Sequence, residues 1–509
     1  MVTSTSRRSS PPTARWYALA AMALSTLAVG LDTTVLSVAL PTLARDLHAS
    51  TGDLQWFTTS YLLVLAATLL PAGMLGDRLG RKRMLIGALA LFGLASVACA
   101  YAQSSGQLIA ARALLGLGAA VIMPMSGAML TVLFGPKERA RAMGVWVTAS
   151  ALGIPLGPLL GGWLLDNFWW GSVFLINVPV VLAGIAALTA WLPESHGERG
   201  GRLDLGGILA STAGLVALTY GIIEAGDRGW GDARSLGTIA AGIVLLAGFV
   251  LWQRRTASPL VDLALFKSRA FTSGAVLATI ASFAMLGLLF SLPQFFSAIG
   301  GQDAFGSGLR LLPVIAGLVV GARLAERIAR RTGARPVITA GLGLIAVASF
   351  AGAFTTATTG YGYVAVWITV TGLGLGLTLP PSLDVAMGAL TVSRSGVGNA
   401  VLQALRQVGG AIGVAVLGTV LNTGYRHHLP AAAPSVARDG VAAGVAAGAH
   451  DPGLLAGVRD AFVHGMDLSL IVGGSAALAG VLLALIFLPR RAAEPVLEEP
   501  SPVLAESGI

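Results

Sequence analysis

Charged residues are scarce in this chain of 509 residues. Asp, Glu, Lys and Arg together make up 11% of it, whereas hydrophobic residues make up 55%. Soluble domains carry roughly 25% charged and 45–50% apolar residues, so this chain has too little charge to cover a water-exposed surface. The mean hydropathy of +0.78 agrees. The composition therefore excludes a set of soluble domains and predicts a chain that mostly faces lipid.

The sequence has almost no cysteine, and it has neither clustered histidines nor a nucleotide-binding loop. Cys99 is the single cysteine, which excludes a disulfide within the chain. The six histidines include no pair with metal-ligand spacing inside an apolar run, and no Gly-x-x-x-x-Gly-Lys-Ser/Thr loop occurs. These absences argue against a metalloenzyme, an enzyme with a nucleophile–histidine pair and an ATP-driven pump. We therefore expect a protein that is not an enzyme and has no metal or cofactor.

What the chain does contain is a series of fourteen apolar runs, each about as long as a helix that spans a bilayer. The runs are too long and continuous for barrel strands, so they predict an all-α integral membrane protein. They cover residues 16–40, 54–74, 84–102, 107–134, 142–165, 171–192, 205–225, 236–252, 271–291, 308–325, 336–355, 361–388, 398–424 and 467–489. The stretch 425–466, rich in Ala, Gly and Pro, is expected to be a long external loop.

The net charge of +9 distinguishes the two sides of the predicted membrane protein. If the N-terminus is cytoplasmic, 24 of the 33 Lys and Arg residues fall on the cytoplasmic side and six on the opposite side. An excess of basic residues is typical of cytoplasmic loops. We therefore expect both termini in the cytoplasm, and we interpret the basic charge as a mark of topology rather than of nucleic-acid binding.

A charged loop motif occurs twice. After the second span the chain reads Gly73-Met-Leu-Gly-Asp77-Arg78-Leu-Gly80-Arg81-Lys82-Arg83, and 249 residues after Asp77 it reads Glu326-Arg327-Ile328-Ala329-Arg330-Arg331. Topology alone would explain two basic loops, but not the repeated acid at matching places in two six-span blocks. The expected organisation is a cytoplasmic tail (1–15), a six-helix bundle (16–200), an inserted helix pair (201–260), a second six-helix bundle (261–490) and a cytoplasmic tail (491–509).

Two sets of opposite charges lie inside predicted spans, where each charge costs at least roughly 2.5–3.5 kcal/mol. Asp32 lies about 12 Å from the outer end of the first span, and Arg112 about 8 Å from the outer end of the fourth. Asp384 and Arg406 lie about 15 Å and 18 Å from the cytoplasmic Arg394 by the same measure. The depths predict one Asp–Arg pair in each half of the protein.

Polar and small residues recur at helical spacing in two further spans. In the thirteenth span, Asn399, Gln403 and Gln407 share one face with Arg406, and this face either lines a central cavity or bonds to a neighbouring helix. In the fifth span, every fourth residue of one face is a glycine, which permits close helix packing. The glycines are Gly153, Gly157 and Gly161.

Taken together, these motifs resemble the major facilitator superfamily, in particular its fourteen-span drug:proton antiporter branch. The likeness rests on five segments of this sequence. They are Leu31-Asp32-Thr33-Thr34-Val35, the loop from Gly73 to Lys82, Leu108-x-x-x-Arg112-x-x-x-Gly116-x-Gly118, Gly153-x-x-x-Gly157-Pro158-x-x-Gly161-Gly162 and Phe174-Leu-Ile-Asn177-Val-Pro179. The fold that the resemblance implies is two six-helix bundles with an inserted helix pair.

The resemblance also implies roles for the motif residues. Gly73, Asp77, Arg78, Gly80 and Arg81 would form a conformational latch at the cytoplasmic face. The glycines of the fifth span, with Pro158 and Gly162, would form the antiporter motif that sets the direction of exchange.

The expected function is export of amphipathic drugs or antibiotics across the cell membrane in exchange for protons, by a monomer in the bilayer. We expect Asp32 with Arg112 to couple the proton, with Asp384 and Arg406 as the second candidate set, and Asn399, Gln403 and Gln407 to line the substrate cavity. A proton-coupled metabolite symporter or exporter of the same fold is the alternative. A membrane receptor that does not transport would have no use for charges inside the spans.

Overall fold

The computed structural model describes residues 12–196, 204–256, 259–391 and 394–488, and these ranges are helical, with no strand. Fourteen helices are long and apolar enough to cross a membrane, which confirms the predicted fold class. The helices are α1 (Pro12–Asp46), α2 (Thr51–Leu79), α3 (Arg81–Ala100), α4 (Ser105–Leu133), α5 (Pro136–Asn167), α6 (Ser172–Leu175), α7 (Asn177–Trp191), α8 (Leu205–Arg228), α9 (Ala233–Arg255), α10 (Arg269–Ala298), α11 (Ala304–Arg310), α12 (Leu312–Thr332), α13 (Ala334–Gly352), α14 (Tyr361–Gly388), α15 (Ser395–His428), α16 (Val441–Ala447) and α17 (Pro452–Phe487), with 3-10 turns η1 (Leu263–Lys267) and η3 (Ser435–Asp439).

Local signals in the sequence determine where several helices begin and end. Ser50 accepts a hydrogen bond from the backbone N–H of Asp53, whose side chain accepts one from the backbone of Ser50, so α2 starts with a capping box. Gly80 separates α2 from α3 with φ of +104°, and Gly333 separates α12 from α13 with φ of +84°. Because glycine adopts positive φ without strain, each of these helix pairs is joined by a single residue.

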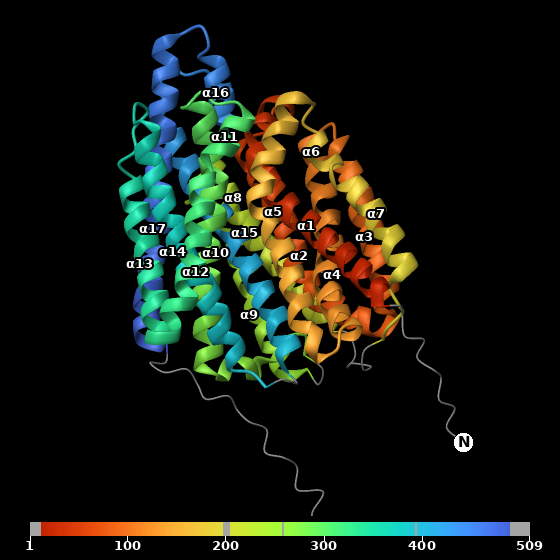
Figure 1. The fold of residues 1–509 in the computed structure, drawn as a ribbon. Coiled ribbons are helices and arrows are strands. Elements are labelled where there is room, and N and C mark those ends of the chain that lie inside the picture. Colours follow the sequence, from red (N-terminus) through yellow and green to blue (C-terminus); the bar gives the residue numbers. More distant parts are fainter. Residues whose placement is uncertain (1–11, 197–203, 257–258, 392–393, 489–509) are drawn as a thin grey trace, which may run out of the picture.

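The helices form two groups that lie side by side. Helices α1–α7 pack on one another, and so do helices α10–α17. Figure 1 shows the first group in red to yellow and the second in green to blue. Helix α1 begins and α17 ends at one end of the molecule, which we call the tail end, whereas α16 lies at the opposite end, which we call the crown end.

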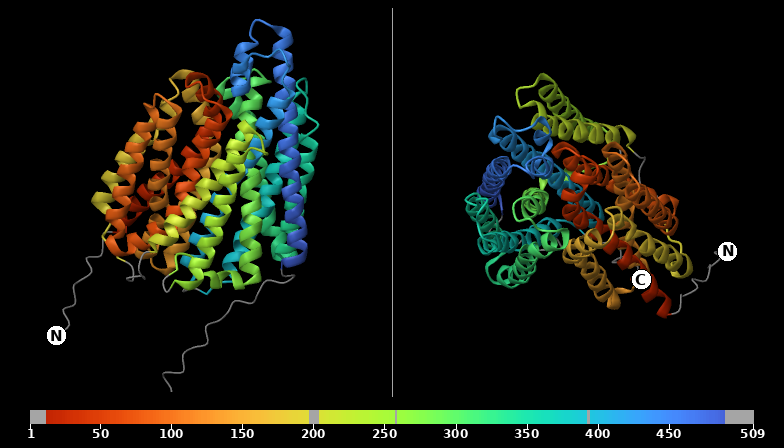
Figure 2. Two further views of the ribbon diagram at one scale, coloured as in Figure 1. Left: turned by 180° about the vertical axis from the view of Figure 1, so that it is seen from behind. Right: turned by 90° about the horizontal axis from the view of Figure 1, so that it is seen from above.

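Helices α8 and α9 form a pair outside both groups. They pack on each other, and α8 also contacts α2 of the first group and α15 of the second. Figure 2 shows this yellow-green pair at the periphery, over the seam between the two groups. The pair is therefore placed to touch both groups without belonging to the core of either.

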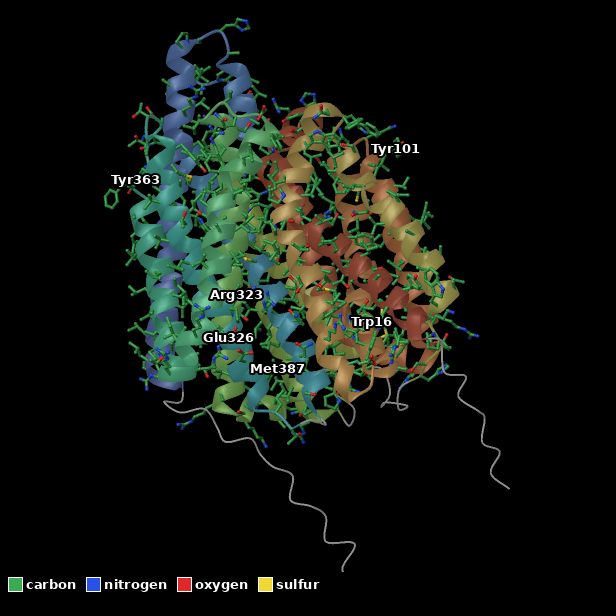
Figure 3. The ribbon with its side chains drawn as sticks, viewed as in Figure 1. Trp16, Tyr101, Arg323, Glu326, Tyr363 and Met387 are labelled. Carbon is green, nitrogen blue, oxygen red and sulfur yellow. The ribbon has the colours of Figure 1, made fainter. Side chains whose placement is uncertain are left out.

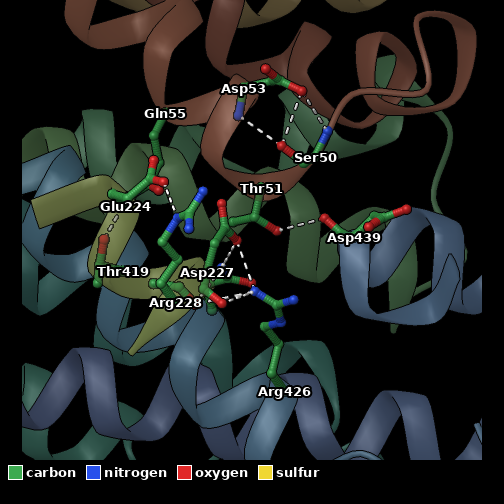
Figure 4. Close-up of polar contacts among 12 residues, drawn as sticks. Ser50, Thr51, Asp53, Gln55, Glu224, Asp227, Arg228, Thr419, Arg426 and Asp439 are labelled. Atoms are coloured by element: carbon green, nitrogen blue, oxygen red, sulfur yellow. Dashed lines mark hydrogen bonds and ion pairs between the residues drawn. The ribbon is translucent and has the colours of Figure 1, made fainter. Parts of the chain in front are cut away.

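The crown end of α8 is bonded to α15. The Arg426 guanidinium donates to the Asp227 carboxylate at 2.9 Å, and the Asn422 amide donates to the same oxygen at 3.1 Å (Figure 4). Toward α2, Ile223 and the Asp227 carboxylate lie against Gly52, and the ring of Tyr220 lies 6.3 Å from that of Trp56. The polar contacts of α8 at this end thus favour the second group.

The tail end of the pair is organised by Asp204, which precedes α8. Its carboxylate accepts hydrogen bonds from the Trp252 indole at 2.9 Å, the Gln253 amide at 2.7 Å and the backbone N–H of Gly207 at 2.8 Å. Burial opposes ionisation of this group, but the hydrogen bonds outweigh burial and hold the pKa of Asp204 below its ordinary value. Gln253 in turn accepts from the backbone N–H of Val261, in the segment that leads to α10.

The crown-end loop is shorter than expected. Helix α15 continues to His428 and α17 begins at Pro452, so the expected extent of the loop, 425–466, is wrong. Asp451 accepts from two backbone N–H groups and Pro452 takes the first helical position, which starts α17 early. With 36 residues, α17 is about 54 Å long, and its first turns stand beyond the other helices in Figure 1.

Candidate functional site

Asp32 and Arg112 form a buried ion pair inside the first helix group. Arg112 Nη1 lies 2.5 Å from Asp32 Oδ2, and each side chain is 1% exposed. Asp32 comes from the middle of α1 and Arg112 from the crown-end half of α4. The pairing that their depths predict is therefore present. Each of these charges depends on the other for its stability, because an unpaired charge buried away from water is strongly destabilising.

The guanidinium of Arg112 has further partners on two other helices. Its Nε donates to the backbone carbonyl of Phe57 on α2 at 3.0 Å. The ring of Tyr61, one turn further along α2, lies 4.6 Å from the guanidinium carbon, and the ring of Phe174 on α6 lies 6.0 Å from it. Four helices thus enclose this one cation. Sequence reasoning missed both rings, because aromatic residues in a span more often face lipid or packing partners.

The glycines of α5 lie at its contact with α1. A side chain at Gly153 would meet the backbone of Gly30, and one at Gly157 would overlap Thr34, whose hydroxyl donates to the backbone carbonyl of Gly153 at 3.0 Å. A side chain at Gly161 would meet Val35 in the same way. The close helix packing that the spacing predicts is therefore present, directly beside Asp32.

The other residues of this motif contact the second helix group. A side chain at Gly162 would lie 2.6 Å from the Cα atom of Phe305 on α11, and Gly308 of α11 packs on the backbone of Pro158. One turn further along α5, the Asp166 carboxylate accepts from the backbone N–H groups of Ala304 and Phe305 at 3.1 and 2.9 Å. A carboxylate at a helix N-terminus is favoured by the helix dipole. Sequence reasoning missed Asp166, whose partners are backbone groups.

A second contact between the groups at the crown end is made by Gln55 of α2. Its buried amide donates to the backbone carbonyls of Val414 and Ala415 on α15 at 3.0 and 2.9 Å. Nearby, the Thr51 hydroxyl donates to the carbonyl of Asp439 at 3.3 Å. Hydrogen bonds therefore join the two groups at the crown end on both the α5 side and the α2 side.

The predicted latch residues surround the turn between α2 and α3. Arg81 binds the Asp77 carboxylate at 2.8 Å, and the positive φ of Gly80 forms the turn between them. A side chain at Gly80 would also lie 2.8 Å from the carboxylate of Glu194, beyond the end of α7. Arg78 lies in the last turn of α2, and a side chain at Gly73 would meet open space. The contacts of Asp77 and Arg81 remain within the first helix group.

The second copy of the motif has the same ion pair in a different setting. Glu326 and Arg330 are 3.6 Å apart, with the same spacing of four residues as Asp77 and Arg81. However, α12 runs on through Ala329, and the turn comes four residues later, at Gly333. The replacement of Gly80 by Ala329 therefore lengthens the helix and moves the turn.

The predicted pairing of Asp384 with Arg406 is wrong. Between these two side chains, both within the described residues, there is no ion pair, and Arg406 instead donates to Gln403 at 2.9 Å. Asp384 is exposed on α14, and its nearest charged neighbour is Glu326 of α12. The reason is tertiary: α14 packs chiefly on α12 and α13, whereas α15 packs chiefly on α10, α17 and α2.

The polar face of α15 remains partly open. Asn399 is exposed, while Gln403, Arg406 and Gln407 are half-buried, and the Nε atom of Arg406 is buried without a hydrogen-bond partner. Figure 3 shows the neighbouring charges Arg323 and Glu326 of α12, with Met387 of α14, in the tail-end half of the molecule. Within the described ranges, no three His, Cys, Asp or Glu side chains are grouped to hold a metal ion.

Fourteen membrane-length helices, twelve in two packed groups and two in the pair α8–α9, are typical of a multi-pass membrane protein. A solved structure of the same fold is that of a bacterial homologue of the human lysosomal transporter Spinster, in an inward-facing and unoccupied conformation. It has a TM-score of 0.67 and 18% identity, and the match covers 95% of this chain and 99% of that one. Residues 22–414 match the Major Facilitator Superfamily, and the chain belongs to this family. It is a transporter of the cell membrane rather than an enzyme.

Curated relatives are resistance and export proteins. The tetracenomycin C resistance and export protein of Streptomyces glaucescens is 33% identical over 499 residues, which cover 94% of this chain and 92% of that protein. The methyl viologen resistance protein SmvA of Salmonella typhimurium is 33% identical over 412 residues, which cover 81% of this chain and 83% of that protein.

Proposed function

We propose that this protein exports amphipathic drugs or antibiotics from the cell in exchange for protons, and that Asp32 with Arg112 couples the two movements. The observation that carries the proposal is the fully buried ion pair at 2.5 Å, in a transporter whose relatives are named for drug resistance and export. A carboxylate paired with a buried arginine can take two states, ionised and paired or protonated and released.

The proposed direction of transport follows from the charge distribution. The 24 basic residues that gather on one side in the sequence include Arg78, Arg81 and Arg330, which lie near the tail ends of α2, α3 and α12, and this supports a cytoplasmic tail end. The crown end then faces outward, where the proton concentration is higher. Asp32 takes up a proton from that side and releases it toward the cytoplasm, and the substrate crosses in the opposite direction.

The contact of α5 with α1 and α11 supports a role in alternation. Gly157 faces α1 close to Asp32, whereas Pro158 and Gly162 face α11 of the other group. A change at the ion pair can therefore reach the crown-end contact through α5, which touches both α1 and α11. The Asp77–Arg81 turn would stabilise one arrangement of the tail end, as the latch implied by the family resemblance. We propose that the protein works as a monomer.

The second half supplies the charges proposed to face the substrate. Asp384 is exposed on α14 beside Glu326 of α12, and Arg406 does not neutralise it. Two acids on one wall favour substrates with a positive group, whereas the half-buried amides of Gln403 and Gln407 offer hydrogen bonds. Asp384 and Arg406 thus remain candidates for substrate recognition, as separate groups and not as a pair.

The test is substrate transport in proteoliposomes under an imposed pH gradient. We expect uphill transport of a fluorescent cationic dye in the wild type, abolition by an uncoupler, and a loss of at least about tenfold in Asp32→Asn, because its amide cannot exchange a proton. Asp46→Asn is the matched control, because Asp46 is an exposed acid at the end of the same helix. Dye transport that ignores the gradient, or that survives in Asp32→Asn, would contradict proton antiport.

A further inference from the structure

We propose that the rings of Tyr61 and Phe174 are positioning residues that hold Arg112 in place when Asp32 is protonated, and so set the pH at which the protein works. The inference rests on the proposed function, because it assumes that Asp32 is the proton carrier. It concerns two residues that do not carry the proton and whose rings face the guanidinium. Both rings belong to the buried core, 1% exposed.

Protonation of Asp32 removes one contact of Arg112, the ion pair, and leaves its other contacts in place. The ion pair with Asp32 loses its charge when the carboxylate takes up a proton. The bond from Nε to the carbonyl of Phe57 stays, and so do the ring faces of Tyr61 at 4.6 Å and Phe174 at 6.0 Å. Among the described residues, the other titratable groups near the pair are the buried thiol of Cys99 on α3 and the phenol of Tyr61 itself.

The two rings stabilise Arg112 more strongly when Asp32 is protonated than when it is ionised. While Asp32 is ionised, its negative charge partly cancels the electric field of the guanidinium at the ring, so the attraction between cation and ring is weak. Once Asp32 is neutral, the guanidinium is a buried cation with no counter-ion, which is the costly situation for a charge in a protein interior. A cation over an aromatic face is stabilised most where both are desolvated. The rings therefore stabilise the protonated state of Asp32 more than the ion-paired state.

The packing of α2 on α4 brings the Tyr61 ring to this position. Gly116 lies one turn after Arg112 on α4, and a side chain there would press on the backbone of Tyr61. The missing side chain lets α2 approach α4 closely enough to place the ring beside the guanidinium. Tyr61 and Arg112 are thus held in register by their own helices. The Tyr61 hydroxyl is buried without a hydrogen-bond partner, so the ring face is the part of the side chain that binds.

The experiment compares Tyr61→Leu with Tyr61→Phe in proteoliposomes. The pH difference across the membrane is kept constant while the absolute pH is varied, and the pH of half-maximal dye transport is measured. Loss of the ring makes Asp32 harder to protonate, so Tyr61→Leu is expected to shift this pH downward by roughly 0.5–1 unit. Tyr61→Phe keeps the ring and should retain the wild-type value. Phe174→Leu should shift it in the same direction by less, because its ring is more distant.

The outcomes separate this inference from the function on which it rests. If wild-type transport does not respond to the pH gradient, the proposed function fails. If the wild type and Tyr61→Phe respond, but Tyr61→Leu and Phe174→Leu keep the wild-type midpoint and lose only maximal rate, the rings are merely structural and the inference is overturned. An upward shift overturns it as well. Should Tyr61→Leu not fold, Phe174→Leu carries the same test.

Discussion

The charge of Arg112 is balanced by partners from several helices. One carboxylate neutralises it, one backbone carbonyl accepts from its Nε, and two rings cover its remaining surface. The arrangement satisfies a guanidinium without water, which is the requirement for a charge at this burial. It also makes Asp32 and Arg112 depend on each other for stability, separately from any role in transport.

Because the two charges stabilise each other, the folding stability of a single variant should be lower than that of the double variant. Arg112→Ala leaves the Asp32 carboxylate buried and unpaired, and should cost about 3–5 kcal/mol of folding stability at neutral pH. The double variant Asp32→Asn/Arg112→Gln has no unpaired charge and should be more stable than Arg112→Ala, although it cannot transport uphill. Thermal unfolding in detergent, followed by the loss of monodisperse protein, measures the difference. A double variant less stable than the single one would contradict the prediction.

At the scale of helices, the pair α8–α9 is bonded more strongly to the second group than to the first. Asp227 binds Arg426 at the crown end, and Gln253 binds Val261 ahead of α10 at the tail end. Asp204 organises the tail end, because its carboxylate connects α8 to the last turn of α9. The three contacts lie at the two ends of the helices, where they resist bending of the pair away from α15.

The lowered pKa of Asp204 gives this connection a pH dependence. A carboxyl group whose pKa is lowered in the folded state stabilises the protein above its ordinary pKa of about 4, and this contribution is lost as the pH falls through the folded-state pKa. Asp204→Asn should therefore be less stable by about 1–2 kcal/mol at pH 7, and the gap should close on acidification. Unfolding curves at pH 7 and at a series of pH values below 4 test this, with Asp46→Asn as a control. A gap that widens as the pH falls below 4 would refute it.

At the scale of the whole molecule, two helix groups meet at a seam that is bonded at the crown end. Asp166 accepts hydrogen bonds from the first backbone N–H groups of α11, and Gln55 donates hydrogen bonds to backbone carbonyls of α15. In an alternating mechanism these contacts break when the crown end opens. Because the hydrogen bonds and the ion pair of Asp227 join the crown end of α8 to α15, the pair should travel with the second group and slide over α2.

Spin-label distances test this division of the moving parts. Labels at the exposed positions Leu236 on α9, His427 on α15 and Gln103 between α3 and α4 give three pairs at the crown end. Between substrate-loaded and low-pH conditions, we expect the Leu236–His427 distance to stay constant and the Leu236–Gln103 distance to change by several ångströms. The Gln103–His427 pair reports whether the crown end opens at all. A constant Leu236–Gln103 distance with a changing Leu236–His427 distance would assign the pair to the first group.

Hydropathy and helix-end signals are local properties of the sequence, and they were enough to predict where the helices lie and where several of them begin or end. They account for the fourteen spans, the turn at Gly80 and the close packing along Gly153, Gly157 and Gly161, because each depends on residues within a few turns of one another. The Asp32–Arg112 pair was also predictable, since both charges are costly in lipid and lie at similar depths. The sequence does not indicate the helical start of α17, because Gly453, Gly457 and Gly465 lie within it and the stretch before it is rich in Ala, Gly and Pro, as loops are.

Which helices become neighbours was decided only by the tertiary structure. Asp384 and Arg406 have suitable depths and opposite charges, yet α14 packs on α12 and α13 and does not bring them together. The rings around Arg112, the hold of Asp166 on α11 and the bond of Asp227 to Arg426 likewise join segments far apart in the chain. Depth in the membrane can be counted along one helix, whereas the direction in which a side chain points depends on how all the helices pack.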